Sequence, residues 1–109
     1  MTTRLPCPYL HGEVELTAER EQHIAEKHPD PLPEHQGLIG ETLADPDGVY
    51  RSRRSGDTRR FARWYDTIRG GKHVVVVVIT QGPPPHRRWI VTAYIARRLP
   101  TGVVEWTRS

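Results

Sequence analysis

The sequence predicts an α+β fold, with two N-terminal helices packed on a four- to five-stranded antiparallel β-meander. Residues 18–27 contain no Gly, no Pro and no β-branched run, and residues 34–43 place apolar side chains three and four positions apart, as helices do. From Val49 onward apolar and polar residues alternate, as they do in strands. With 109 residues, the chain is expected to form one domain over residues 1–109.

The first twelve residues lack a regular pattern. Pro6, Pro8 and Gly12 interrupt helix and strand alike, so residues 1–12 are expected to be an N-terminal arm or an edge strand.

Two helices should follow this segment. Thr17 is a suitable N-cap for a helix over 18–27, which must end near His28 because Pro29 disfavours helical geometry in the residue before it. A turn at 30–33 then leads into a second helix from Glu34 to Leu43.

The rest of the chain predicts strands. The expected strands are separated by Gly, Asp and Pro turns, among them the proline-rich loop 81–86, and they cover residues 49–54, 59–66, 73–80, 89–96 and 103–106. Five consecutive valines make 73–80 the expected central strand, buried on both faces.

Composition excludes several classes of protein. The longest apolar run, Val74–Ile79, is far shorter than the ~20 residues that a membrane-spanning helix needs, so no membrane partner is expected. Residues 1–8 lack the basic and apolar segments of a secretory signal. The single cysteine, Cys7, permits no internal disulfide, which predicts a cytoplasmic protein.

Charge is divided unevenly along the chain. Residues 1–50 carry ten acidic and three basic side chains, whereas residues 51–109 carry three acidic and thirteen basic ones. This asymmetry predicts a polyanion-binding face on the second half, or two surfaces that partly neutralise each other within the fold.

The segment 51–64 holds six arginines and only one acid, Asp57. On a hairpin, Arg51 and Arg53 would share one face of the first strand. On the second strand, alternation would place Phe61 on the same face as Arg59, Arg63 and Tyr65. Guanidinium groups interleaved with aromatic rings are typical of sheets that hold single-stranded RNA. The alternative is a solvated hairpin whose arginines pair with the acids of the first half.

Histidines are frequent, six in all. His23 and His28 would point about 140° apart on the first helix, so joint ligation of a metal is not expected, and neither a metal nor another cofactor is predicted. Either imidazole is suited to acid–base chemistry near neutral pH; the alternative is a surface histidine and a helix-ending one.

Two further places carry candidate groups. Lys72 opens the central strand and is a candidate for nucleic-acid contact, or a solvated turn residue. Thr92 and Tyr94 would share one face of the strand 89–96, where their hydroxyls either line a site or mark the outer side of the sheet.

Together, these features resemble the phage-associated nucleases of the barnase, EndoU, colicin and RelE-like superfamily (BECR-type). The resemblance covers roughly residues 16–96 and rests on the order of short motifs, namely Leu16-Thr17, His23-Ile24, His28-Pro29-Asp30, Ile39–Leu43, Asp45-Pro46-Asp47, the valine strand and Ile90–Tyr94. It implies N-terminal helices on a four-stranded antiparallel sheet, and metal-independent cleavage of RNA by a toxin or phage effector.

The resemblance also implies roles for individual residues. The implied catalytic residues are His23, His28, Arg63, Thr92 and Tyr94. Phosphate contacts are expected on the basic hairpin and beside it, from Arg51, Arg53, Arg59, Arg63, Tyr65 and Lys72.

Metal-free RNA cleavage needs a base for the 2′-hydroxyl, an acid for the leaving 5′-oxygen, and cations for the charge on the phosphate. The expected partners are RNA and an inhibitor protein, an antitoxin or immunity protein. The alternatives are a non-catalytic RNA- or protein-binding module with the same fold, and a subunit that pairs through its acidic half with a basic partner.

Overall fold

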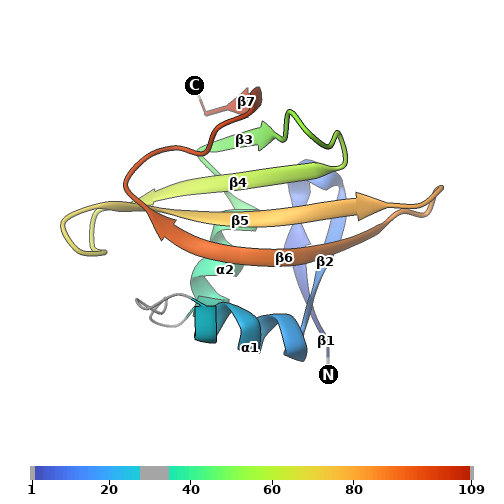
Figure 1. Cartoon of the computed structure of the whole chain (residues 1–109), viewed down its shortest axis with the longest axis horizontal. Helices are drawn as coiled ribbons and strands as arrows, with labels where there is room; N and C mark the ends of the chain where they lie inside the picture. Colours follow the sequence, from blue (N-terminus) through green and yellow to red (C-terminus); the bar gives the residue numbers. More distant parts are fainter. Residues whose placement is uncertain (1, 28–34, 109) are drawn as a thin grey trace.

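A single mixed sheet of seven strands forms the centre of the computed structural model, which describes residues 2–27 and 35–108 (Figure 1). The elements are, in chain order, β1 (Thr2–Cys7), the short 3-10 helix η1 (Pro8–Leu10), β2 (Gly12–Thr17), α1 (Ala18–Lys27), α2 (His35–Ala44), β3 (Gly48–Arg51), β4 (Thr58–Tyr65), β5 (Lys72–Gln81), β6 (Arg87–Ala96) and β7 (Val103–Thr107). The strands lie in the order β1-β2-β6-β5-β4-β3-β7.

The predicted fold class is wrong. Two strands precede the helices, and the sheet is mixed because β2 runs parallel to β6, next to it, through the pair Glu15 and Trp89. The chain also does not meander to its end, since β7 pairs with β3 on the far side of the sheet and not with β6.

The edge strand expected as one alternative for residues 1–12 is confirmed by β1, whereas β2, which starts at Gly12, was not predicted. In β2, Val14 and Leu16 are buried and alternate with the more exposed Glu13 and Glu15. Pro6 lies in β1 opposite Glu13, and β1 is an edge strand of the sheet. An edge strand tolerates proline because the missing N–H can face away from the ladder.

The first helix is confirmed, and the second extends one residue further than predicted, to Ala44. The Arg20 backbone N–H donates to the Thr17 hydroxyl at 3.1 Å, which caps α1. The predicted helix 34–43 is observed as His35–Ala44. The expected helix end at His28, the turn 30–33 and Glu34 lie outside the described residues.

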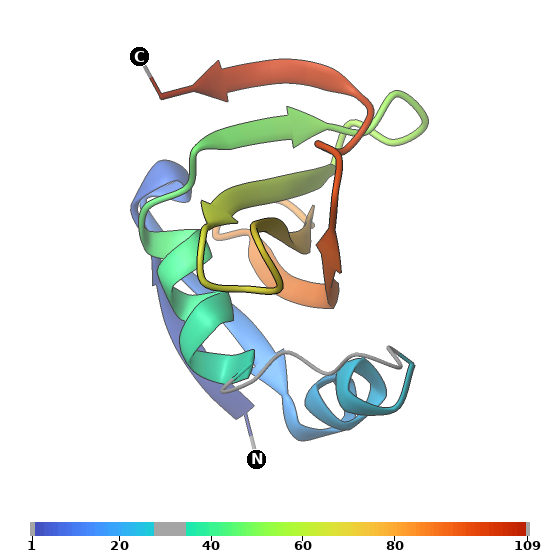
Figure 2. The same cartoon turned by 90° about the vertical axis from the view of Figure 1, so that its left-hand side faces the viewer.

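Both helices pack on the main core, but at different places along the sheet: Ile24 of α1 and Ile39 and Leu43 of α2 belong to the same buried cluster. Figure 2 shows α2 (green) to the left of the strands and α1 (blue) below them. Helix α2 contacts β5, β4 and β1, whereas α1 contacts β6 and β2.

The central strand is confirmed as β5, which lies between β4 and β6. Val74, Val76 and Val78 join the main core beneath the helices, while Val75 belongs to a second buried cluster on the other face. All five valines, Val74–Val78, are buried, so β5 has no solvated face along this stretch.

Neither helix in the described part of the chain is long and apolar enough to cross a membrane.

Candidate functional site

The strands from β7 to β6 curve, and the inner side of the curve faces away from α2 (Figure 2). We call this side the concave face and the side that α2 covers the convex face. Strand alternation and the second buried cluster define the concave face by its residues: Tyr50, Arg60, Ala62, Trp64, His73, Val75, Val77, Thr92, Tyr94 and Ala96.

Strand register arranges these residues in rows across the sheet. Arg60 on β4 is opposite Val77 on β5, and Val77 is opposite Thr92 on β6. Because neighbouring strands are ~4.8 Å apart, Arg60 and Thr92 are separated by about 10 Å. The next row holds Tyr94, opposite Val75. The register therefore places a guanidinium and two hydroxyls on one surface.

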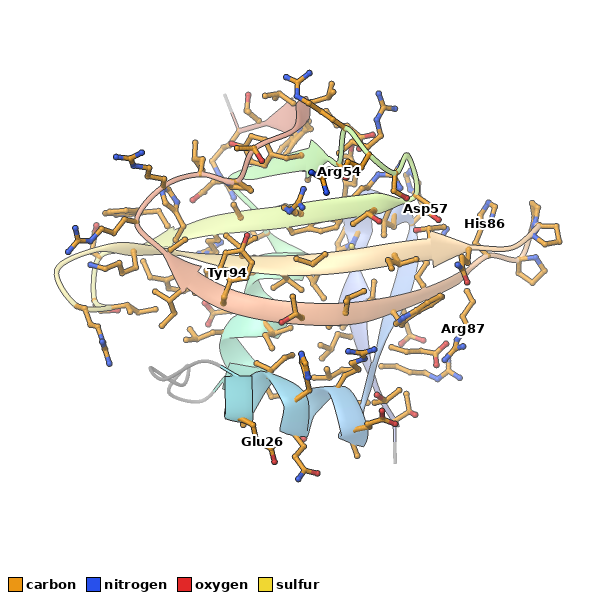
Figure 3. All side chains as sticks on the ribbon, viewed as in Figure 1. Glu26, Arg54, Asp57, His86, Arg87 and Tyr94 are labelled. Atoms are coloured by element: carbon orange, nitrogen blue, oxygen red, sulfur yellow. The ribbon has the colours of Figure 1, made fainter. Side chains whose placement is uncertain are left out.

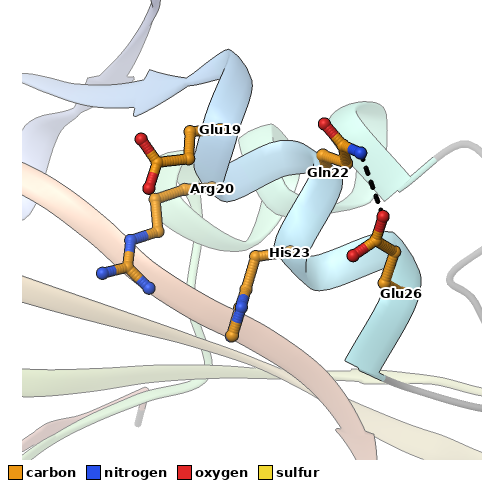
Figure 4. A pocket seen from close by; sticks show the side chains of 5 residues that line it. All are labelled: Glu19, Arg20, Gln22, His23 and Glu26. Carbon is orange, nitrogen blue, oxygen red and sulfur yellow. Dashed lines mark hydrogen bonds between the residues drawn. The ribbon is translucent and has the colours of Figure 1, made fainter.

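Helix α1 adds two polar side chains beside this surface. Arg20 and His23 are three residues apart, so they lie on the same side of the helix, and both point toward β6 (Figure 4). They line a shallow pocket with Glu19, Gln22 and Glu26, in which the Gln22 amide donates to Glu26 at 2.9 Å. Ile24, the residue after His23, is buried in the core and fixes the rotation of the helix.

On the convex face, the arginines of the hairpin are paired with carboxylates. Glu105 of β7 accepts from Arg59 at 2.8 Å and lies 3.7 Å from Arg51. Arg63 donates to Asp45 at 2.9 Å. Hydrogen bonds from Arg108 and Arg63 lower the pKa of Asp45, so that this carboxylate stays ionised.

In the described structure, the remaining arginines of the hairpin have no such partner. Among the described residues, no acidic side chain pairs with Arg53, Arg54 or Arg60, which belong to the β3–β4 turn and the concave face. Paired and unpaired arginines of β4 therefore alternate with the two faces of the strand. The arginines on the face that carries Phe61 are neutralised, and the other face is left positively charged.

The predicted catalytic residues are brought together only in part. Thr92 and Tyr94 lie half-buried on the concave face. Tyr94 is labelled in Figure 3, and Figure 4 shows His23 of α1 pointing toward β6, the strand that carries both residues. Arg63 is on the convex face with Asp45. His28 lies outside the described residues.

The predicted phosphate contacts are also divided. Arg51 and Arg59 share Glu105 on the convex face, and Arg53 is in the exposed turn. The Tyr65 hydroxyl donates to Glu41 at 3.1 Å, and burial raises the pKa of this phenol. The Lys72 ammonium donates to the carbonyls of Arg69 and Gly71 at 2.9 and 3.1 Å.

Arg20, Arg60 and Trp64 were not predicted as site residues. One signal could have identified Arg60: Phe61, its neighbour, is the only phenylalanine of the chain and is fully buried. A large apolar residue in a strand marks the face that points into the core, so the residues beside it point the other way.

At one end of the concave face, the ring of His73 meets the ring of Trp64 edge-on, with 4.9 Å between centroids. Trp64 also covers Gly71, where a Cβ would collide with the indole. The buried His73 Nδ1 has no hydrogen-bond partner in the described part of the protein, and burial lowers the pKa of this imidazole while the charge of Asp47 opposes the shift.

Stability should therefore depend on pH through His73. Unfolded histidine has a pKa of about 6.5, so as pH falls below this value the unfolded chain takes up a proton that the folded protein does not, and stability decreases. We expect the urea midpoint of the wild type to fall more between pH 7.5 and 5.5 than that of His73→Gln. The other histidines are common to both proteins, so equal falls would contradict the role assigned to His73.

In chemical terms, the concave face and α1 offer an imidazole, two hydroxyls and guanidinium groups that no described carboxylate pairs with. Imidazole transfers protons near neutral pH, and guanidinium binds phosphate oxygens with two parallel hydrogen bonds. Over residues 2–27 and 35–108, no group of three His, Cys, Asp or Glu side chains is arranged to hold a metal ion.

The comparisons with known proteins add no assignment: no family model, no curated protein and no solved structure matches the chain.

Proposed function

We propose that this protein is a small metal-independent endoribonuclease of the toxin or phage-effector type, and that RNA binds on the concave face. The observation that carries the proposal is the separation of charge between the two faces. Arg51, Arg59 and Arg63 are neutralised on the convex face, whereas Arg60 has no acidic partner in the described structure and shares the concave face with Thr92 and Tyr94.

In the proposed reaction, the RNA 2′-oxygen attacks the adjacent phosphorus and the bond to the 5′-oxygen breaks, which leaves a 2′,3′-cyclic phosphate. His23 accepts the proton of the 2′-hydroxyl, and Tyr94 donates a proton to the leaving oxygen. Exchange with solvent then restores both groups. No cofactor takes part.

Arg20 and Arg60 are the proposed cations for the charge that builds on the phosphate, in place of Arg63, and Thr92 positions the phosphate with its hydroxyl. His23, Thr92 and Tyr94 thus keep the roles that the sequence predicts, whereas the paired Arg63 is replaced by two arginines that have no acidic partner among the described residues. The proposed place of action is the cytoplasm, with an inhibitor protein that covers the concave face.

A non-catalytic RNA-binding module of the same fold is the second candidate. It is favoured by His23, whose ring has no hydrogen-bond partner among the described residues to orient it. Catalytic histidines are commonly held in one tautomer by such a partner.

The test is cleavage of a labelled mixed-sequence RNA in EDTA, beside the same sequence made as DNA. We expect RNA fragments with 2′,3′-cyclic phosphate ends and intact DNA, because only RNA has the internal nucleophile. Tight binding without cleavage would favour the binding module. Neither binding nor cleavage would contradict both candidates.

A further inference from the structure

We infer that a second, non-reacting phosphate of the RNA strand binds in a pocket between the β3–β4 turn and the start of β7. This inference rests on the proposed function, and it assigns the path along which the RNA strand crosses the sheet. The pocket encloses about 180 Å³ and is lined by Ser52, Arg53, Arg54, Arg60, Thr101 and Gly102.

Charge is the first support. Three arginines line one small pocket, and in the described structure none of them pairs with a carboxylate. Like charges held this close repel each other, and an anion between them removes that repulsion. The paired arginines of the convex face show that the same hairpin neutralises its guanidinium groups where they have a structural role.

The one acid of the hairpin does not serve the pocket. Asp57 accepts hydrogen bonds from the hydroxyls of Ser55 and Thr58, the latter at 3.3 Å, so its carboxylate is engaged within the turn. Arg54 and Asp57 both belong to this turn, which comes just before the start of β4 (Figure 3). The pocket therefore keeps its positive charge although an acid is near in sequence.

The far wall of the pocket is built by a close backbone approach. Gly102 has a φ of +132°, and a Cβ at this position would lie 2.5 Å from the Arg51 carbonyl oxygen. Only glycine fits there without strain, so Thr101 and Gly102 are fixed against the end of β3. A wall set by the backbone gives the pocket a defined width.

Arg60 connects the pocket to the proposed reaction site. It lines the pocket, and its row across the sheet leads through Val77 to Thr92 on β6. An RNA strand that follows this row crosses the β-strands β6, β5 and β4 perpendicular to their direction. One phosphate would then lie beside His23 and a later or earlier one between Arg53, Arg54 and Arg60.

The test measures binding of a fluorescein-labelled single-stranded oligodeoxynucleotide of mixed sequence, which lacks the 2′-hydroxyl and cannot be cleaved by the proposed chemistry. Anisotropy is recorded over a range of salt concentrations for the wild type and for Arg53→Gln/Arg54→Gln. The matched control is Arg97→Gln/Arg98→Gln, which removes the same charge from another exposed Arg-Arg pair. Circular dichroism verifies that both variants are folded.

We expect Arg53→Gln/Arg54→Gln to bind at least about tenfold more weakly at 0.1 M salt, because charge-assisted hydrogen bonds to a phosphate are lost. The slope of log K against log salt should also shrink by about 0.7, the value for one phosphate contact on a single strand. The control should lose less affinity than this. Equal losses in the two variants would overturn the inference, since overall charge alone would then attract the strand.

A further measurement distinguishes a pocket that binds free phosphate from one that binds a phosphate of the RNA strand. Inorganic phosphate at millimolar concentration should compete only weakly with the oligonucleotide; full competition would assign the pocket to a free anion and overturn the inference. The two proposals can fail separately. Binding that depends on Arg53 and Arg54, with no cleavage of RNA, would contradict the ribonuclease proposal and support the phosphate pocket. Cleavage of RNA, with equal loss of binding in the two double variants, would support the ribonuclease proposal and contradict the pocket.

Discussion

Replacing His23 with alanine should reduce RNA cleavage in EDTA by about 10²- to 10⁴-fold, the usual contribution of a positioned acid–base group. The side chain is half-buried on α1 and points toward β6 without making a hydrogen bond in the described structure, so its removal should leave the circular dichroism spectrum and the urea midpoint close to those of the wild type. The measurement is the initial rate of cleavage at saturating and limiting RNA.

The matched control is His86→Gln, which changes an exposed histidine in the turn between β5 and β6. It should cleave RNA at the wild-type rate. His28→Ala belongs in the same series: loss of cleavage there, with full cleavage by His23→Ala, would transfer the acid–base role to the second histidine of the motif. Full cleavage by both variants would exclude a histidine of this motif as the base.

Val76→Asp should abolish folding at room temperature. Val76 is fully buried in the main core, on the strand at the centre of the sheet, and an unpaired carboxylate there costs more than about 4 kcal/mol. Small domains are stable by only about 5–15 kcal/mol, so the variant loses most or all of its margin. Circular dichroism and urea unfolding measure the loss.

Val104→Asp is the control for this variant. The same substitution there places the carboxylate on β7, where Val104 is 57% exposed, and the expected change is within about 0.5 kcal/mol. A cooperative unfolding transition of Val76→Asp close to that of the wild type would contradict the assignment of β5 as the centre of the core.

Helices and strands could be predicted from the sequence where a single residue type determines the local backbone conformation. Thr17 marks the start of α1, and the valine run identifies β5, because capping and burial act on neighbours in the chain. The strand order could not be predicted in this way. That β2 lies beside β6, and β7 beside β3, depends on contacts between residues far apart in the sequence.

The candidate site was predicted in its residue types more than in its geometry. Thr92 and Tyr94 share a face as expected, but the face chosen on β4 was the one that carries Phe61 and points into the core. Alternation alone gives two equivalent faces. Only the position of a large buried residue distinguishes them, and an arginine can be paired on one face and unpaired on the other.

The terminal position of β7 has a consequence for how molecules meet in concentrated solution. One side of this strand pairs with β3, and the other is an outer edge of the sheet, with Val103, Val104 and Trp106 exposed along the strand. Unpaired main-chain groups on an apolar edge can add a strand from another molecule. Such edge-to-edge association would lengthen the sheet and leave the concave face accessible. Self-association through β7 is therefore compatible with binding of an RNA strand by each copy.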